Sequence, residues 1–392
     1  MKVTGVRTKP YYFQMSRPYA DANFPEGRIW TSGLAVFVDT DEGLTGVGIS
    51  SPGAAGAVQS LGSILMGEDP RGVRGLWKRM VDRVFKGGNR GIMGDALSCL
   101  DAALWDLKAK YNNEPLWRTL GALEPRAKAY ASDIGLCLSD DELRAFYSHM
   151  ADMGISDGKL KVGLDMESDL RRLGIMKECL SRNARRPGLA IDSNEYWSPK
   201  QAIRYIREME CHYDLSWAEE PARRWDYAGL KKVSDNVTTA VATGENLDDI
   251  GDYMALIDYR TADIIEIGIG TSGITGAMQV AHMCYGFEIP VCMMGTPGSY
   301  MAHVAAALPN HIMMEVPDLG LECCFAVDTR IEDGWIVLGD KPGLGIEFDE
   351  EKLEELSRAS QQPHPPIAPG RRVGAALYIV PPSEADNASK DY

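Results

Sequence analysis

The sequence predicts an α/β protein in which a barrel of eight parallel strands follows a smaller α+β domain. From about residue 126, short apolar runs alternate with amphipathic helical segments. The runs end near Ser132, Val162, Asp192, Glu219, Gly244, Ile267, Met293 and Glu315. Such regular alternation is typical of a (β/α)₈ barrel rather than of an open sheet.

The first 125 residues predict the α+β domain. Residues 33–39 and 45–48 are strand-like and flank the turn 40–43, which indicates a β-hairpin. Helical patterns follow at about 68–84 and 92–111, and the second keeps its apolar residues on one face with the 3.6-residue period. Barrel strands are expected only after these helices.

The composition describes a globular, acidic protein. Of the 392 residues 45% are hydrophobic, and 41 Lys and Arg against 56 Asp and Glu give a net charge of −15. This charge argues against a nucleic-acid partner. No apolar run approaches the ~18 residues of a membrane span, and the N-terminus lacks the apolar core of a secretion signal. We therefore expect a cytoplasmic protein with a small-molecule substrate and no membrane partner.

The cysteines agree with a reducing compartment. None forms a Cys-x-x-Cys pair and most lie in apolar contexts, so we expect buried, reduced thiols. The eight are Cys99, Cys137, Cys179, Cys211, Cys284, Cys292, Cys323 and Cys324.

Three acidic residues at the ends of successive runs predict a metal site. Asp192, Glu219 and Glu245 follow one another at intervals of 27 and 26 residues, which is about one strand, one helix and two loops of a barrel. Carboxylates at the ends of adjacent parallel strands converge above the barrel. Three oxygen ligands suit a hard divalent cation, most naturally Mg²⁺. Each carboxylate alone could instead be a solvated group on the barrel rim.

Two lysines stand one repeat upstream of the acidic residues. Lys159 and Lys161 alternate along a strand, so both side chains are expected to point into the barrel mouth. Positive charge near a metal is expected to lower the pKa of each lysine and make a neutral amine accessible. The alternative is that both side chains extend to solvent.

Four short motifs follow one another along the barrel. They are Lys-x-Lys at 159–161, Asp-x-Asn at 192–194, Glu-Glu-Pro at 219–221 and Gly-Glu-Asn at 244–246. Together they resemble the mandelate racemase subgroup of the enolase superfamily, over roughly residues 1 to 357. The resemblance implies a (β/α)₇β-type modified TIM barrel with an N-terminal α+β capping domain. The expected divisions are a capping domain (1–125), a barrel (126–345), and a C-terminal segment (346–392) that packs back on the cap and ends in a flexible tail.

The resemblance also implies roles for single residues. Lys161 corresponds to the base that removes the proton α to a substrate carboxylate, and Lys159 to a residue that lowers its pKa and binds that carboxylate. Glu315 corresponds to an electrophile that hydrogen-bonds the carboxylate. Mg²⁺ would stabilise the enediolate. Asn194, Glu220 and Asn246 correspond to residues around the metal ligands or the substrate, or to loop polar groups and caps. A homo-oligomer is expected. The candidate substrate contacts on a loop of the cap are Tyr19, Asp21, Asn23, Arg28 and Trp30.

One departure from the family pattern limits the chemistry. The relatives that work on both faces of the substrate carry a His-Asp pair opposite the lysines. Met294 stands where the His is expected, and Ile267 or Gly268 where the Asp is expected. Glu266 is close to this position but has no His to pair with.

The missing pair favours elimination over racemisation. Racemisation needs a base on each face of the α-carbon. A syn β-elimination needs one base and one acid, and Lys161 can serve as both in turn. The sequence therefore predicts a Mg²⁺-dependent acid-sugar dehydratase, a carbon–oxygen hydro-lyase that converts an aldonate or aldarate into a 2-keto-3-deoxy acid. The alternatives are a racemase, epimerase or other isomerase with an unrecognised second acid, and a metal-binding protein without this catalysis.

Overall fold

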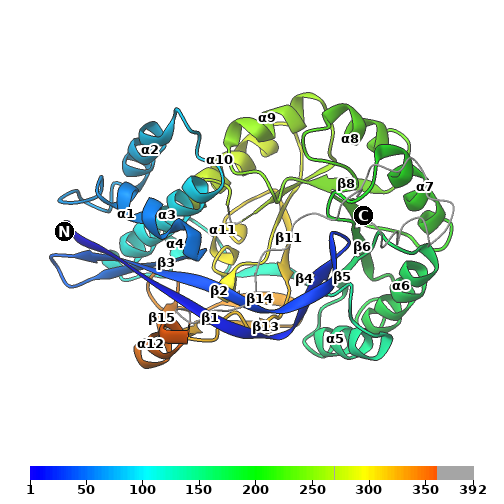
Figure 1. The fold of residues 1–392 in the computed structure, drawn as a ribbon, viewed down its shortest axis with the longest axis horizontal. Helices are drawn as coiled ribbons and strands as arrows, with labels where there is room; N and C mark the ends of the chain where they lie inside the picture. The colour runs from blue at the N-terminus through cyan, green and yellow to red at the C-terminus, as the bar shows by residue number, and fades with distance from the viewer. Residues whose placement is uncertain (269, 360–392) are drawn as a thin grey trace.

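The structure is a computed structural model that describes residues 1–268 and 270–359. The sequence-based expectation of a flexible tail falls on residues 360–392, outside the described part. Within that part no helix has the length and apolar character to cross a membrane. Figure 1 shows a barrel with a smaller sheet-and-helix domain beside it, joined by two long strands that cross the barrel mouth.

The barrel has the eight parallel strands that the alternation predicts. Neighbouring strands pair in sequence order, and the last pairs with the first to close the barrel. The strands are β4 (Arg126–Ser132), β5 (Asp157–Lys161), β6 (Gly188–Asp192), β7 (Trp217–Glu219), β8 (Ala240–Thr243), β9 (Ile264–Ile267), β10 (Val291–Met293) and β11 (His311–Val316). The fold class is therefore confirmed.

Seven helices separate the strands and form the outer ring in Figure 1. Their starts carry strong local signals: Ser139 caps its helix reciprocally with Glu142, and Ser198 does so with Gln201. The helices are α5 (Asp140–Asp152), α6 (Met166–Leu180), α7 (Pro199–Glu210), α8 (Tyr227–Ser234), α9 (Ile250–Asp258), α10 (Gly273–Gly286) and α11 (Ala302–Ala305).

The N-terminal part is a three-stranded antiparallel sheet packed on helices. The predicted hairpin is present, with Leu34 paired to Ser50 and Val38 paired to Gly46. The long helix begins at Ile92 and ends at Tyr111, as predicted. The elements are β1 (Val3–Asp21), β2 (Phe24–Thr40), β3 (Thr45–Ser50), η1 (Pro52–Ala54), α1 (Ala55–Gly62), α2 (Val73–Val84), α3 (Ile92–Tyr111) and α4 (Leu116–Thr119).

The segment that carries Tyr19, Arg28 and Trp30 is not a loop, and that expectation was wrong. β1 and β2 continue as a two-stranded ribbon almost to the turn at 22–23, with Tyr19 paired directly to Arg28. The ribbon reaches across the barrel mouth, where the amide of Asn23 donates to the carbonyl of Asn194 (2.8 Å). The cap therefore covers the ends of the barrel strands with a regular element.

Arg17 of β1 fastens the ribbon to the barrel. Its guanidinium donates to three backbone carbonyls at the two strands that close the barrel. These belong to Ser132, the last residue of β4, to Asp133, which follows it, and to Pro317 after β11. The backbone of Ala20 adds two hydrogen bonds to the loop after β4, through Ile134 (2.9 Å) and Leu136 (3.1 Å). These contacts hold the ribbon at the first and last strands of the barrel.

The chain end returns to the cap. Lys9 of β1 forms an ion pair with Glu354, and the ring of Phe348 packs edge-on against Phe37 of β2, with 5.3 Å between centroids. The remaining elements are η2 (Pro297–Ser299), β12 (Phe325–Val327), β13 (Thr329–Glu332), β14 (Trp335–Leu338), β15 (Ile346–Phe348) and α12 (Glu350–Ala359).

Candidate active site

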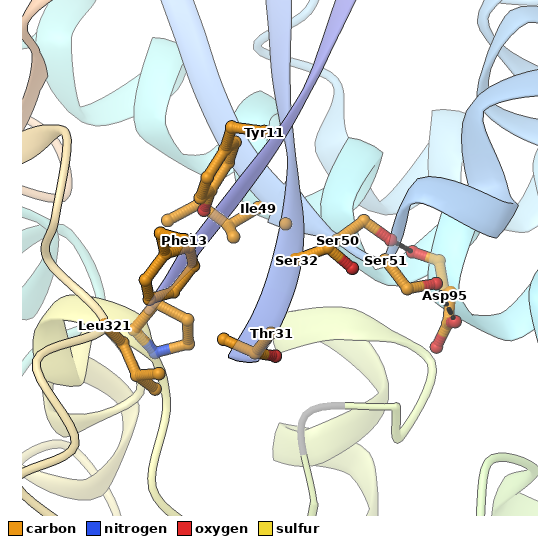
Figure 2. A pocket seen from close by; sticks show the side chains of 11 residues that line it. Tyr11, Phe13, Thr31, Ser32, Ile49, Ser50, Ser51, Asp95 and Leu321 are labelled. Atoms are coloured by element: carbon orange, nitrogen blue, oxygen red, sulfur yellow. Dashed lines mark hydrogen bonds between the residues drawn. The ribbon is translucent and has the colours of Figure 1, made fainter. Parts of the chain in front are cut away.

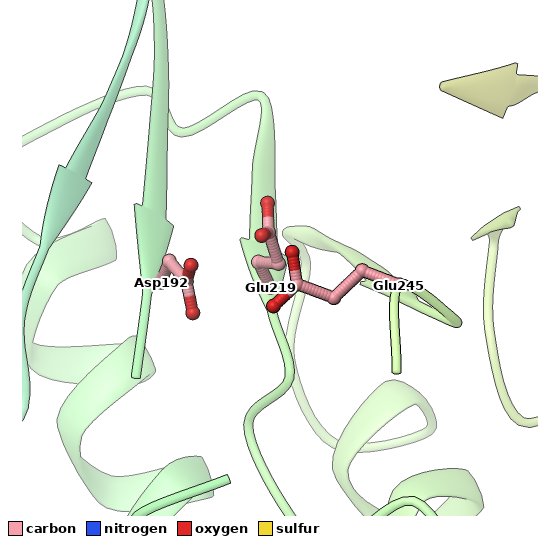
Figure 3. Close-up of side chains that lie close together, drawn as sticks. All are labelled: Asp192, Glu219 and Glu245. Carbon is pink, nitrogen blue, oxygen red and sulfur yellow. The ribbon is translucent and has the colours of Figure 1, made fainter. Parts of the chain in front are cut away.

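Three carboxylates meet at the C-terminal ends of adjacent barrel strands. Asp192 ends β6, Glu219 ends β7, and Glu245 follows β8. Asp192 and Glu219 are paired with each other in the sheet register. Figure 3 shows the three side chains turned toward one another, and each contributes an oxygen that lies within 4.8 Å of the other two. A cluster of three carboxylate oxygens matches the ligands that Mg²⁺ prefers. These residues could hold a divalent cation, as the sequence predicts.

Both lysines of β5 point into this cluster rather than to solvent. The Nζ of Lys159 donates to Glu219 and lies 3.1 Å from Glu315 and 3.4 Å from Asp192. The Nζ of Lys161 lies 2.5 Å from Asp192 and 2.8 Å from the side-chain oxygen of Asn194. Lys159 is 1% exposed and Lys161 is 3% exposed, which excludes the solvated alternative.

The chain's own residues raise the pKa values of both lysines, and the lowering expected from a nearby metal ion stays a prediction. Burial lowers the pKa of Lys159, but Glu219 and Glu315 outweigh it, and its pKa is raised well above the usual value. Burial also lowers the pKa of Lys161, but Asp192, Tyr19 and Glu245 together outweigh it, and its pKa is likewise raised well above the usual value. The charge of Lys159 does oppose protonation of Lys161, as the resemblance implies.

The acidic cluster carries more negative charge than the two lysines balance. Burial, followed by the charge of Asp192, raises the pKa of Glu219 to about 8. Burial also raises the pKa of Glu245, whereas the lysines hold the pKa of Asp192 below its usual value against the effect of burial. Such crowding of buried like charges is costly in the chain alone, and a dication among the carboxylates would relieve it.

Glu315 of β11 joins the lysines from two strands away, because β4 lies between β11 and β5. One carboxylate oxygen faces Lys159, and the other accepts a hydrogen bond from the backbone N–H of Gly295 (3.0 Å). Burial raises its pKa, but Lys159 and Lys161 outweigh this effect and lower it. Glu315 is therefore an ionised acceptor beside Lys159.

The residues that follow the carboxylates form a hydrogen-bonded rim. Asn246 donates from its amide to Glu220 (2.8 Å) and to Glu245 (3.2 Å). Asn194, Glu195 and Glu220 all have positive φ values, of 46°, 58° and 42°. Left-handed backbone at three non-glycine residues of one rim is a cost that proteins concentrate at functional sites.

The side opposite the lysines is apolar except for one buried acid. Met294 is 5% exposed and packs in the barrel interior with Tyr130, Trp217 and Cys292. Glu266 of β9 is fully buried beside Glu219 and receives no hydrogen bond from the described residues. Burial and the charge of Glu219 raise the pKa of Glu266 well above its usual value, so it is a neutral acid that can donate to Glu219.

The ribbon contributes to a cavity of about 310 Å³ above the rim, which we call the mouth cavity. Tyr19, Asp21 and Asn23 line it from the cap, and Asn194, Glu220, Glu245 and Asn246 line it from the barrel. Arg28 and Trp30 do not line it. The guanidinium of Arg28 lies over the ring of Tyr19, 5.2 Å from its centroid, and Trp30 is 43% exposed and stacked on Tyr12. Of the five ribbon residues predicted from the sequence, three line the mouth cavity and two do not.

Sequence reasoning missed two supports of the site. Asp133 accepts a hydrogen bond from the backbone N–H of Lys161 (3.0 Å) and thereby fixes the end of β5. Arg224 donates to Glu195 (2.5 Å) and to the carbonyl of Asn246 (2.8 Å). Asp133 directly follows an apolar run, as Asp192 does, so its place at a strand end was a usable signal.

Comparison with known proteins agrees with this geometry. Residues 142–352 match the model of the Enolase C-terminal domain-like family, and residues 31–121 match that of the Mandelate racemase / muconate lactonizing enzyme, N-terminal domain. The chain is similar to a racemase of Streptomyces coelicolor A3(2) solved with bound magnesium, with a TM-score of 0.84 and 26% identity over 90% of this chain and 99% of that one.

Relatives with an assigned activity catalyse several reactions. The chain is 28% identical to 3,6-anhydro-alpha-L-galactonate cycloisomerase of Streptomyces coelicolor, over 83% of this chain and 91% of the relative. It is 27% identical to L-talarate/galactarate dehydratase of Salmonella typhimurium, over 89% and 90%. Epimerases and an arabinonate dehydratase match at similar identity. The chain therefore belongs to the mandelate racemase/muconate lactonizing enzyme family of the enolase superfamily.

Proposed function

We propose that the protein is a Mg²⁺-dependent dehydratase of a sugar acid, with Asp192, Glu219 and Glu245 as the metal ligands. Bound there, Mg²⁺ would supply positive charge to the oxygens of the substrate carboxylate. Lys159, held between Glu219 and Glu315, would bind the same carboxylate and orient the substrate. The family and its sugar-acid relatives support this reaction class.

The observation that carries the proposal is the asymmetry of the site. Lys161 is a buried amine on one face, and Met294 is the apolar side chain opposite. Lys161 would take the proton from C2 and hold it at Nζ. In a syn elimination the same proton passes to the hydroxyl on C3, the C3–O bond breaks, and water leaves. The enol then loses the proton of its C2 hydroxyl and takes one at C3, which gives the 2-keto-3-deoxy acid.

A second candidate is supported by the cycloisomerase relative. If the oxygen on C3 belongs to an anhydro ring, the same elimination opens the ring and the leaving oxygen stays in the product. Nothing is lost, so the reaction is an isomerisation with the same single base. An epimerase would need a second acid, for which the buried Glu266 is the candidate on β9.

The test incubates the protein and Mg²⁺ with a panel of aldonates, aldarates and anhydro sugar acids in D₂O. A dehydratase gives 2-keto-3-deoxy products from open-chain acids, and a cycloisomerase gives 2-keto products only from anhydro acids. An epimerase gives exchange at C2 without a 2-keto product. Failure of every acid to exchange or react would leave a metal-binding protein without this catalysis. We also propose a cytoplasmic location, which the eight free thiols support.

A further inference from the structure

Each of two cavities beside the candidate reaction centre presents an unpaired carboxylate. In the mouth cavity this is Asp21, which accepts hydrogen bonds from the N–H groups of Asn23 (2.7 Å) and Phe24 (3.2 Å) and from the hydroxyl of Tyr19 (3.3 Å). Within residues 1–268 and 270–359, no Lys or Arg forms an ion pair with it. Its neighbours stabilise its negative charge without neutralising it.

The cationic side chain in the lining of the mouth cavity is already bound. Arg224 donates to Glu195, which is 3% exposed, and its remaining hydrogen bond goes to a backbone carbonyl. Glu220, also buried, adds a further carboxyl group to the same lining. A second anionic group of a substrate would therefore meet acids and an arginine that is already neutralised.

The second cavity, of about 240 Å³, lies at the seam between cap and barrel, and we call it the seam cavity (Figure 2). It has apolar walls that include Phe13 and Leu321. Its polar lining consists of Tyr11, Thr31, Ser32, Ser50, Ser51 and Asp95, with no Lys or Arg among the described residues that line it. Asp95 accepts a hydrogen bond from the hydroxyl of Ser51 (2.9 Å).

The seam cavity lies at the same end of the barrel as the carboxylate cluster. Pro297 and Leu321, which line it, follow the C-terminal ends of β10 and β11. The mouth cavity borders the centre directly, since Glu245 lines it. A substrate fixed by its carboxylate at the metal site can extend its other end into the mouth cavity, and the seam cavity is the second place at this end of the barrel for the test to examine.

We propose that the substrate is a monocarboxylate with an uncharged polyhydroxy end, and that Asp21 and Asp95 select it over a dicarboxylate. The inference rests on the proposed function and narrows it from sugar acids in general to aldonates. A carboxylate accepts hydrogen bonds from sugar hydroxyls in either cavity. A second carboxylate on the substrate can donate none, and it would be desolvated beside a like charge without a cation.

The test measures affinity independently of turnover. The Lys161→Ala variant with Mg²⁺ is titrated calorimetrically with D-galactonate and with galactarate, which differ only in CH₂OH or carboxylate at C6, and with other aldonate–aldarate pairs. We expect each bound aldonate to bind at least tenfold more tightly than its aldarate. The preference should shrink in Asp21→Asn or Asp95→Asn, while Asp140→Asn on the outer helix α5 leaves it unchanged.

Equal or tighter binding of the aldarates overturns the inference, and so does binding of neither class. If Arg28→Gln then abolishes aldarate binding, that guanidinium receives the second carboxylate. An equal loss of affinity for aldonate and aldarate in both Asp21→Asn and Asp95→Asn would mean that these residues act only structurally. That result also overturns the inference. If the unaltered protein forms no 2-keto product from an aldonate that it binds, the proposed function is wrong. The preference for aldonates over aldarates in binding would still hold in that case.

Discussion

The Nζ of Lys161 lies 2.5 Å from a carboxylate oxygen of Asp192, so the proposed base is in direct contact with a proposed metal ligand. The two residues are register partners on β5 and β6, which places them side by side wherever the barrel forms. Because the two residues are in contact, metal binding and proton abstraction must be tested with variants that each change only one of them.

Substitution of Lys161 by Ala should stop proton removal at C2. We expect the rate of dehydration to fall by about 10³-fold or more, because general-base catalysis of this kind contributes ~10²–10⁴-fold and the neighbouring Lys159 is held by Glu219 and Glu315. The measurement is deuterium incorporation at C2 by NMR, with the Mg²⁺ affinity as control. Exchange that persists in this variant would move the role of base to another residue, with Lys159 first.

Substitution of Glu219 by Gln should weaken Mg²⁺ binding, because one of three clustered carboxylates is lost. We expect affinity to fall at least about tenfold, together with turnover. Glu220→Gln is the matched control, since the neighbouring carboxyl group bonds Asn246 instead of joining the cluster. Calorimetric titration with Mg²⁺ decides this, and an unchanged affinity of the Glu219→Gln variant would refute the ligand assignment.

Of two sugar acids that are epimers at C2, only one should be dehydrated. A substrate held by its carboxylate presents one face to Lys161, and the other face meets Met294. Turnover of both epimers of each active acid is compared by assay of the 2-keto product. Comparable rates, or interconversion of the epimers, would reveal a second acid or base, and Glu266→Gln would then be the variant to measure.

The protein should lose stability in acid through His303. This side chain is 2% exposed, accepts a hydrogen bond from the N–H of Trp117 (3.0 Å), and burial lowers its pKa from 6.5 to about 4. Between these values the unfolded chain binds a proton that the folded chain excludes. The stabilisation is therefore complete above pH 6.5 and falls by about 3 kcal/mol as the pH drops through 4.

The matched variant for this prediction is His303→Asn, which keeps a hydrogen-bond acceptor but cannot titrate. Denaturant unfolding at pH 7 and at pH 4 should show a larger acid loss for the unaltered protein than for the variant. The same loss in both would mean that other groups cause the acid sensitivity.

The sequence predicts the barrel strands well because strand and helix alternate locally. The run that ends at Asp192 and the run that ends at Glu219 each show their strand end within a few residues. The expected clustering of the carboxylates needs only the regular geometry of the barrel. Asp and Glu supply carboxylate oxygens wherever they stand, so the acidic cluster could be inferred from the sequence alone.

The cap and the electrostatics could not be predicted in this way. Pro10 and Pro18 make residues 3–21 look interrupted, yet tertiary pairing with β2 carries one strand through both. The partners of Arg17 are backbone carbonyls, which leave no trace in the sequence. The sign of the lysine pKa shifts depends on the contacts of Lys159 and Lys161 with carboxylates rather than on composition.

The docking of the ribbon also has a consequence for the order of synthesis. The backbone N–H of Ser16 in β1 donates to the carbonyl of Leu319, and Lys9 of β1 pairs with Glu354, 345 residues later. We therefore expect the first strand to leave the ribosome long before its partners exist. The mouth of the nascent barrel should stay uncovered until the partners of β1 at Leu319 and Glu354 have been translated.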